Sequence, residues 1–247
     1  MNTSSLIESF SLYSSNQYII PSYLMAFTEL RNQMIDWLHF LCNNLHFRQE
    51  TLYRSISIFD IYISKAYTTE NLLDIENVKL IAIASLSLST KIEEINCNFL
   101  NFFSEQVLQN ETTPKMLAKK ELSILKKLNF KTNQSTCYQF LTVFQELFSN
   151  LFGKANSQIN NYFCNLSEQY LIIAIKSDVF LSQKDLALIA VNQALMQINT
   201  CDNSLSIIVF NFMQHLQNII NYNNKSFEFI YQQPAINSNT VNPILSL

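Results

Sequence analysis

Apolar side chains recur every three or four residues over most of the chain, which is the spacing of helices that bury one face. In a first block this pattern predicts five helices, at about residues 24–41, 49–67, 78–95, 99–108 and 114–128. The last of these has a clear start signal, because Thr113 is a good N-cap and Pro114 suits the first helical turn. The first block is therefore predicted to be a helical bundle.

The third segment is ambiguous, because residues 81–88 alternate between apolar and small or polar side chains as a half-buried strand does. The alternation slips phase between Ile83 and Leu86, and the segment is longer than a normal strand. A helix surrounded by other helices explains the small residues better, since Ala and Ser let neighbours approach closely. We therefore expect a central helix.

A second block repeats the plan, with helices predicted at 138–147, 158–176, 182–198 and 204–222. The run 184–191 is rich in Ala and aliphatic residues, as is the run 80–88. A short N-terminal arm precedes the first block, and its Leu6, Phe10 and Leu12 are spaced for one amphipathic turn. The domains are therefore predicted as an arm (1–21), two tandem bundles (22–132 and 133–230) and a flexible tail (231–247).

Composition supports an all-α fold and restricts the function. The 247 residues include one Gly and four Pro, too few for the tight turns of a β-sandwich or barrel. Charged residues make up 14%, yet no apolar run reaches the length of a membrane span. The net charge is −3 and no Lys/Arg-rich stripe is evident, so we expect neither a nucleic-acid partner nor a membrane partner.

The cysteines and the N-terminus indicate where the protein resides. Five cysteines are far apart in sequence and form no Cys-x-x-Cys pair, which favours buried reduced thiols over a zinc site or a disulfide framework. The N-terminus lacks a basic region followed by a long apolar stretch, so no secretory signal is expected. We expect an intracellular protein of the nucleus, the cytoplasm or both.

No pattern typical of catalysis is present. His39, His46 and His215 are isolated and lack metal-ligand spacing, and one glycine cannot form a Gly-rich phosphate loop. We therefore expect no catalytic residues, no metal site and no cofactor. A protein-binding module remains as the interpretation.

Four short motifs then resemble the cyclin family. Residues 30–38 resemble the cyclin-box opening Met-Arg-x-x-Leu-x-Asp-Trp-Leu, and Asp60 matches the acidic position of the family's Asp-Arg-Phe-Leu stretch. Residues 90–94 look like the Ala-Ser-Lys-x-Glu-Glu that ends the central cyclin helix, and residues 121–130 are similar to the Glu-x-x-x-Leu-x-x-Leu-x-Phe of the fifth cyclin helix. Order and intervals agree over about 100 residues, and residues 162–195 resemble the second cyclin fold. The pattern is closest to cell-cycle A/B-type cyclins.

The resemblance implies two tandem five-helix cyclin folds and a regulatory subunit, not an enzyme, that binds and activates a cyclin-dependent protein kinase. In the family, residues matching Lys91 and Glu121 hold main-chain groups of the kinase beside its regulatory helix. The residues matching Leu88, Ile92, Leu125 and Phe130 help line an apolar groove for that helix. Arg31 and Asp60 match residues that tie the first two helices together.

Departures from the family pattern leave a second hypothesis open. In the family, an apolar patch docks kinase substrates, and the matching residues here are Leu30, Gln33, Met34 and Trp37. Gln33 is polar, so the patch is degenerate. Kinase substrates are further candidate partners. A nearby acidic position is Phe40, and two groove positions hold Ile92 and Thr132. The alternative is a cyclin-fold scaffold subunit of a larger complex without kinase activation.

Two other interpretations were considered. Spacing alone would fit an ordinary ion pair between Lys91 and Glu121. A general transcription factor of the same fold would need a basic surface and usually a zinc ribbon, which the sequence lacks.

Overall fold

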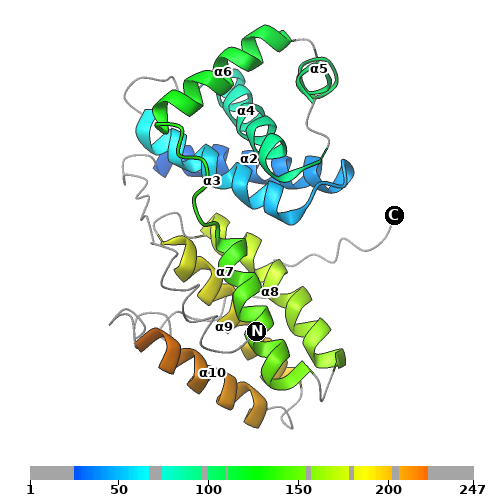
Figure 1. The fold of residues 1–247 in the computed structure, drawn as a ribbon, viewed down its shortest axis with the longest axis vertical. Helices are drawn as coiled ribbons and strands as arrows, with labels where there is room; N and C mark the ends of the chain where they lie inside the picture. The colour runs from blue at the N-terminus through cyan, green and yellow to red at the C-terminus, as the bar shows by residue number, and fades with distance from the viewer. Residues whose placement is uncertain are drawn as a thin grey trace. The chain divides into compact units, whose positions relative to one another are not determined.

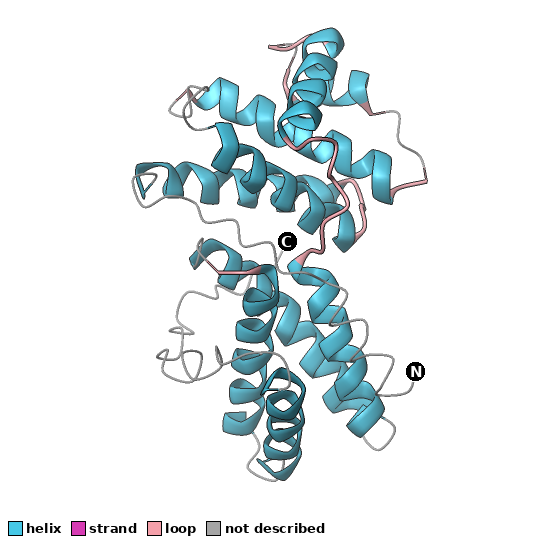
Figure 2. Ribbon diagram, turned by 60° about the vertical axis from the view of Figure 1, so that its left-hand side comes forward, coloured by secondary structure: helices cyan, strands magenta, loops and turns pink. Residues whose placement is uncertain are grey.

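A computed structural model describes residues 25–66, 74–95, 99–109, 111–153, 157–177, 181–201 and 206–221 (Figure 1). Within these ranges every regular element is a helix, and Figure 2 draws helices and loops but no strand there. The predicted all-α class is therefore confirmed. The predicted turn around Leu6, Phe10 and Leu12 and the predicted flexible tail lie outside the described residues.

The five helices predicted for the first block are present, with small shifts at their ends. They are α2 (Met25–Asn44), α3 (Gln49–Ala66), α4 (Ile75–Glu93), α5 (Leu100–Phe102) with the π-helical turn η2 (Phe103–Val107), and α6 (Pro114–Lys127). The N-cap prediction for α6 is confirmed, because Thr113 Oγ1 accepts a hydrogen bond from the Met116 backbone N–H at 3.3 Å. Likewise, Asp74 caps α4 by accepting from the Glu76 N–H at 3.1 Å.

The fourth helix departs from the single α-helix that the sequence predicted. One α-helical turn passes into a π-helical turn, in which the Leu108 N–H donates to the Phe103 carbonyl at 2.9 Å. Phe103 and Leu108 are five residues apart and both are buried. A wider turn places residues at this spacing closer to one face than an α-helix does, which accounts for the departure.

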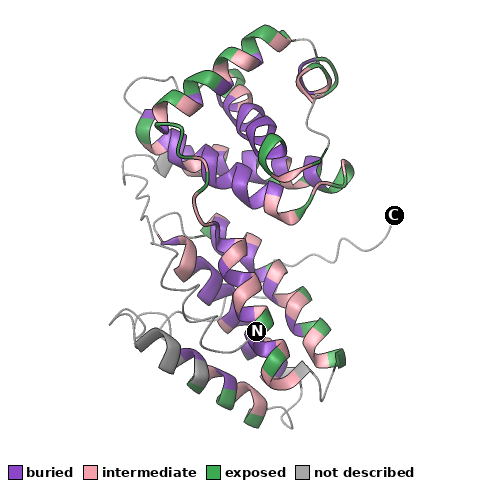
Figure 3. Ribbon diagram, viewed as in Figure 1, coloured by how far each residue is buried: buried purple, intermediate pink, exposed green. Residues whose placement is uncertain are grey.

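α4 is the central helix of its bundle, as predicted. It contacts α2, α3 and α6, and all residues from Ile81 to Thr90 are buried (Figure 3). Small side chains allow this close packing. Two buried serines also satisfy their hydroxyls within the helix, because Ser85 donates to the Ile81 carbonyl at 2.8 Å and Ser89 donates to the Ser85 carbonyl at 2.9 Å. Buried hydroxyls in this helix therefore explain a period-two pattern that resembled a strand.

The chain divides into two compact units. The described part of the first unit holds α2–α6, residues 128–140, and residues 175–177 and 181–186. The second unit holds described residues within 141–174 and 187–221. The domain limits expected from the sequence remain a prediction, and each unit is considered by itself below.

The second block forms the helices that the periodicity predicted. They are α7 (Cys137–Phe148), followed by the π-helical turn η3 (Ser149–Gly153), then α8 (Ser157–Ser177), α9 (Gln183–Cys201) and α10 (Ser206–Asn221). Within the second unit the rings of Phe148, Phe163 and Phe212 form a buried cluster, with Phe148 stacked on Phe163 at a centroid distance of 4.2 Å and edge-on to Phe212 at 5.0 Å. Aromatic packing therefore joins α7, α8 and α10.

Candidate functional site

Lys91 and Glu121 meet where the last turn of α4 faces the middle of α6. Lys91 Nζ donates to both carboxylate oxygens of Glu121, at 2.7 Å to Oε1 and 2.6 Å to Oε2. The Glu121 side chain is only 8% exposed, whereas that of Lys91 is 35% exposed. An ammonium has three donors and a carboxylate has about four acceptor positions, so the pair keeps hydrogen-bonding capacity for a further molecule.

The four apolar residues predicted beside this pair differ in exposure. Ile92 is 43% exposed and Phe130 is 64% exposed, while Leu125 is half-buried. Leu88 is buried, so it supports this region from within the bundle and contributes little surface. The Lys91–Glu121 pair with Ile92, Leu125 and Phe130 is called the pair surface below.

Phe130 is held in place by the end of α6. The Phe130 N–H donates to the Leu125 carbonyl at 2.8 Å and the Asn129 N–H donates to the Lys126 carbonyl at 3.1 Å, which is the Schellman arrangement that ends many helices. Asn129 and Phe130 have φ values of 52° and 59°. A bulky residue rarely adopts this left-handed conformation, which costs about 1 kcal/mol or more. Phe130 is therefore an exposed aromatic ring on a constrained backbone.

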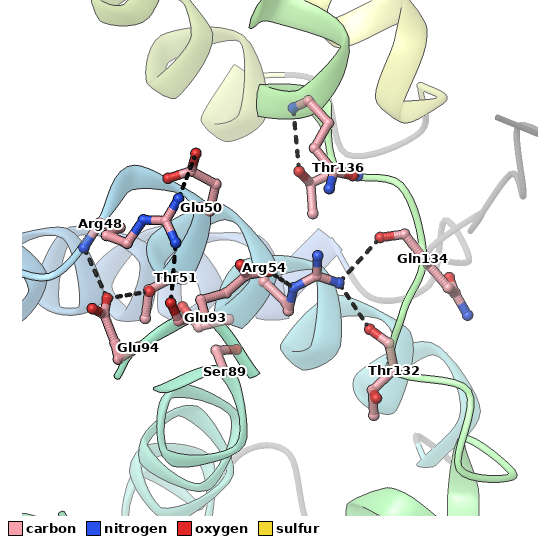
Figure 4. Close-up of polar contacts among 12 residues, drawn as sticks. Arg48, Glu50, Thr51, Arg54, Ser89, Glu93, Glu94, Thr132, Gln134 and Thr136 are labelled. Atoms are coloured by element: carbon pink, nitrogen blue, oxygen red, sulfur yellow. Dashed lines mark hydrogen bonds and ion pairs between the residues drawn. The ribbon is translucent and has the colours of Figure 1, made fainter. Parts of the chain in front are cut away.

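A second polar cluster holds the end of α4, and the sequence analysis missed it (Figure 4). Arg54 on α3 donates from Nε to the Glu93 carboxylate and from one terminal nitrogen to the main-chain oxygens of Thr132 at 3.0 Å and Gln134 at 3.4 Å. Arg54 is buried. The available signal was an arginine inside a helical segment whose other residues from Thr51 to Phe59 are uncharged, because a buried charge needs an acceptor.

Glu94, the residue after Glu93, joins α4 to the start of α3. Its carboxylate accepts from the Arg48 backbone N–H at 2.9 Å and from the Thr51 hydroxyl, and Arg48 donates from its side chain to the Glu93 carbonyl at 3.2 Å. An acidic group at a helix N-terminus is favourable because the unpaired N–H groups there carry partial positive charge. The C-terminal end of α4 is thus fixed by two neighbouring carboxylates.

The buried Arg31 and the partly buried Asp60 form an ion pair between α2 and α3. Arg31 Nε donates to Asp60 Oδ1 at 2.7 Å, and a terminal nitrogen donates to Oδ2 at 2.8 Å. The other terminal nitrogen of Arg31 donates to the Ile175 carbonyl at 3.0 Å, and the Asn32 side chain donates to the Lys176 carbonyl at 3.2 Å. The pair therefore also caps the C-terminus of α8, a contact that sequence spacing could not reveal.

The degenerate docking patch on α2 presents little apolar surface. Met34 is buried and Leu30 and Trp37 are half-buried, so the polar Gln33 is the exposed member. Phe40, further along α2, is exposed. Substrate docking through these residues remains a prediction.

One sequence expectation needs correction, because α6 does carry a basic stripe. Lys115, Lys119 and Lys126 are exposed, whereas Leu117, Glu121 and Ile124 on the same helix are buried. At 100° per residue the three lysines lie opposite the buried face. The segment is visibly rich in lysine, with five in the 14 residues of α6, and the helical arrangement places these three on one exposed face. The stripe points away from Glu121 and is not part of the pair surface.

Groups typical of catalysis or metal binding do not come together in the described part of the chain. His39 is half-buried and His46 is exposed, and no group of three or more His, Cys, Asp or Glu residues is placed to hold a metal ion there. Cys42 and Cys137 are free and buried, and burial raises the pKa of each thiol to about 12. These thiols are protonated at neutral pH and unreactive. Among the described helices, none combines the length and apolar character of a membrane span.

Comparisons with known proteins agree with these observations. The family model "Cyclin, N-terminal domain" matches residues 6–133. G2/mitotic-specific cyclin-B of Spisula solidissima is 31% identical over 113 residues, which cover 46% of this chain and 25% of that protein. G2/mitotic-specific cyclin-4 of Saccharomyces cerevisiae is 32% identical over 123 residues, which cover 48% and 25%. The match thus spans about a quarter of the length of these curated relatives.

The fold also matches a solved structure. The X-ray structure of a viral cyclin from herpesvirus saimiri superposes with a TM-score of 0.60 at 14% sequence identity, covering 89% of this chain and 93% of that one. This likeness supports the cyclin fold. Because the family model accounts for more than half of the residues, the chain belongs to the cyclin family.

Proposed function

We propose that this cyclin is the regulatory subunit of a cyclin-dependent protein kinase, which it binds and activates through the pair surface. The observation that carries the proposal is the bidentate Lys91–Glu121 contact with spare donors and acceptors, together with two exposed apolar residues of the same elements, Ile92 at the end of α4 and Phe130 after α6. An internal ion pair does not require exposed apolar side chains beside it. A docking site does, because interfaces combine an apolar centre with a few directed hydrogen bonds.

The physical role of each part follows from its chemistry. Lys91 offers a charge-assisted donor to a kinase main-chain carbonyl, and Glu121 offers an acceptor to a main-chain N–H. Ile92, Leu125 and Phe130 offer apolar contact to the kinase's regulatory helix. Holding that helix inward lets its glutamate pair with the ATP-site lysine, so the cyclin shifts the kinase toward its active state without touching the reaction.

The test uses the whole chain and a panel of purified cyclin-dependent kinases, with binding and peptide phosphorylation measured separately. We expect Lys91→Ala with Glu121→Ala to weaken binding at least about thirtyfold, as loss of an interface hot spot does. The matched control is Glu76→Ala with Lys79→Ala, which removes an exposed ion pair of 3.0 Å from the other end of α4 and should leave binding unchanged.

A charge exchange separates docking from folding. Lys91→Glu with Glu121→Lys retains one positive and one negative side chain, so the ion pair can re-form while the donor and acceptor offered to the kinase change places. We expect normal thermal unfolding and lost kinase binding. Kinase binding that survives both double variants would refute the pair surface as the docking site. Binding without increased phosphorylation would instead assign the chain to the scaffold role.

A further inference from the structure

Arg54 has a position that the pair surface does not itself explain. Its side chain is only 4% exposed, and it lies on α3 among residues 51–59, all of which are buried. Burying a guanidinium costs desolvation energy, and apolar side chains in place of a buried ion pair often serve stability as well or better. A buried arginine is therefore expected where a particular geometry has to be held.

The groups that Arg54 binds belong to two separate elements. One is the Glu93 carboxylate at the end of α4, and the others are the main-chain oxygens of Thr132 and Gln134. Residues 131–135 have no regular secondary structure, so the carbonyls of Thr132 and Gln134 lie outside any helix or sheet ladder. Figure 4 shows the guanidinium between Glu93 and this segment. Arg54 is the group that joins them.

Both elements border the pair surface. Glu93 directly follows Lys91 and Ile92, and Thr132 comes two residues after Phe130. The segment between α6 and α7 is fixed at both ends, by the Schellman arrangement before it and by a capping box after it. In that box the Thr136 N–H donates to Gln139 Oε1 at 3.1 Å and the Gln139 N–H donates to Thr136 Oγ1 at 3.3 Å. Arg54 supplies a contact to its middle.

We propose that Arg54 is a positioning residue that sets the separation between the Lys91–Ile92 end of α4 and Phe130, and thereby the affinity for the kinase. This inference rests on the proposed function and names a residue that makes no contact with the kinase. Fixed spacing matters because an interface formed by pre-organised groups loses less conformational entropy on binding.

The experiment measures the segment and the kinase separately in the full chain. Arg54→Met removes the three contacts while keeping an unbranched side chain. The amide hydrogens of Lys131 and Thr136 are hydrogen-bonded at 3.1 Å each, so their exchange reports how firmly the segment is held. We expect exchange at these amides and the kinase dissociation constant each to rise about tenfold, the effect of losing one charge-assisted hydrogen bond.

Two further variants separate positioning from stability. Arg54→Met with Glu93→Met removes both charges of this part-buried pair, so thermal unfolding should return toward that of the unmodified chain, while fast exchange and weak kinase binding persist. Arg48→Met is the matched control, because the Arg48 side chain is exposed and contacts the Glu93 carbonyl without reaching residues 131–136. We expect this control to leave both measurements unchanged.

The possible results distinguish this proposal from the proposed function. Unchanged exchange at Lys131 and Thr136 in Arg54→Met would overturn the positioning role, as would full kinase affinity in the double variant. If the unmodified chain binds none of the kinases, the proposed function fails, and the exchange measurement still decides whether Arg54 holds the segment.

Discussion

Both units pack through aromatic rings, but the first is also cross-linked by ion pairs between helices, whereas the described residues of the second contain no lysine or arginine. In the first unit these interhelix pairs include three with at least one buried member, Arg31–Asp60, Arg54–Glu93 and Lys91–Glu121, and the exposed pair Lys176–Asp36. Ring packing contributes stability over a range of geometries, but a bidentate ion pair holds at one separation and angle. The unit with the directional contacts is the one to which we assign the kinase-binding surface.

The two units are stabilised by different kinds of polar contact. In the first unit Arg31 and Arg54 are held by carboxylates and main-chain acceptors. Residues of the second unit are held by apolar area and by neutral contacts such as Gln145 to Ser167 at 3.0 Å and Tyr170 to Gln197 at 3.2 Å. The two units should therefore respond differently to substitution and to pH.

The largest expected effect is in the second unit. Phe148→Ala removes a ring that packs on Phe152, Phe163 and Phe212, and we expect the free energy of unfolding to fall by about 4 kcal/mol. Urea unfolding with hydrogen exchange resolved by unit would measure it. Phe210→Ala is the control, because Phe210 on α10 is 61% exposed. Equal costs for the two variants would contradict ring packing as the main stabilising contact of this unit.

The next effect tests the ion pairs of the first unit. Arg31→Met leaves the Asp60 carboxylate and the Ile175 carbonyl without their donor, and we expect a loss of about 3 kcal/mol in the same measurement. Arg31→Met with Asp60→Leu should recover most of it. Lys176→Met, which breaks the exposed contact with Asp36 at 2.7 Å, should cost less than about 1 kcal/mol. If Arg31→Met lowers the free energy of unfolding no more than Lys176→Met does, the burial of Arg31 does not increase the stabilising effect of its ion pair.

The smallest effect is a pH dependence of opposite sign in the two units. Burial lowers the pKa of His39 in the first unit, with Asp36 opposing the shift and Lys176 adding to it. The folded state therefore binds fewer protons at His39 than the unfolded state does. Above the unfolded-state pKa, His39 contributes to the free energy of unfolding, and this contribution is lost as pH falls below that pKa and through the folded-state pKa. In the second unit burial raises the pKa of Glu168, which the Gln145 hydrogen bond partly opposes. The contribution of Glu168 to the free energy of unfolding is therefore complete below its unfolded-state pKa, and it is lost as pH rises through its folded-state pKa.

Acidification from pH 7 to pH 5 should therefore lower the His39 contribution and raise that of Glu168. Hydrogen exchange of each unit at the two pH values measures both. His39→Gln and Glu168→Gln should each remove the pH dependence of its own unit only. A shift of the same sign in both units, unaffected by these variants, would mean that other groups control the response.

Much of the first unit could be predicted from local sequence. Helical periodicity gave the ends of α2, α3 and α6 closely, and Thr113 with Pro114 marked the start of α6, because caps depend on neighbouring residues alone. The π-helical turn after α5 was not predicted, since it depends on burying Phe103 and Leu108 together. The lysine stripe on α6 was missed although five of the 14 residues of that helix are lysine, because a low overall charge hides a local concentration.

The candidate site shows the same limit. Lys91 and Glu121 were named because short motifs resemble those of a family, and residue spacing alone could not distinguish a docking site from an ordinary ion pair. Arg54 belongs to none of those motifs, and its acceptors lie 39 to 80 residues away in sequence. A local sequence pattern does not predict a contact between a helix and main-chain carbonyls that lie far away in the sequence.

By itself the sequence determined the helical class, the order of the helices and the residues of the ion pair, because periodicity, caps and motifs are properties of neighbouring positions. The tertiary structure decided which charges are buried, that Arg31 caps α8, and that Arg54 connects α4 to residues 131–136. These depend on how helices pack. A buried charge is stable only beside a suitably oriented acceptor, and folding alone brings the two together.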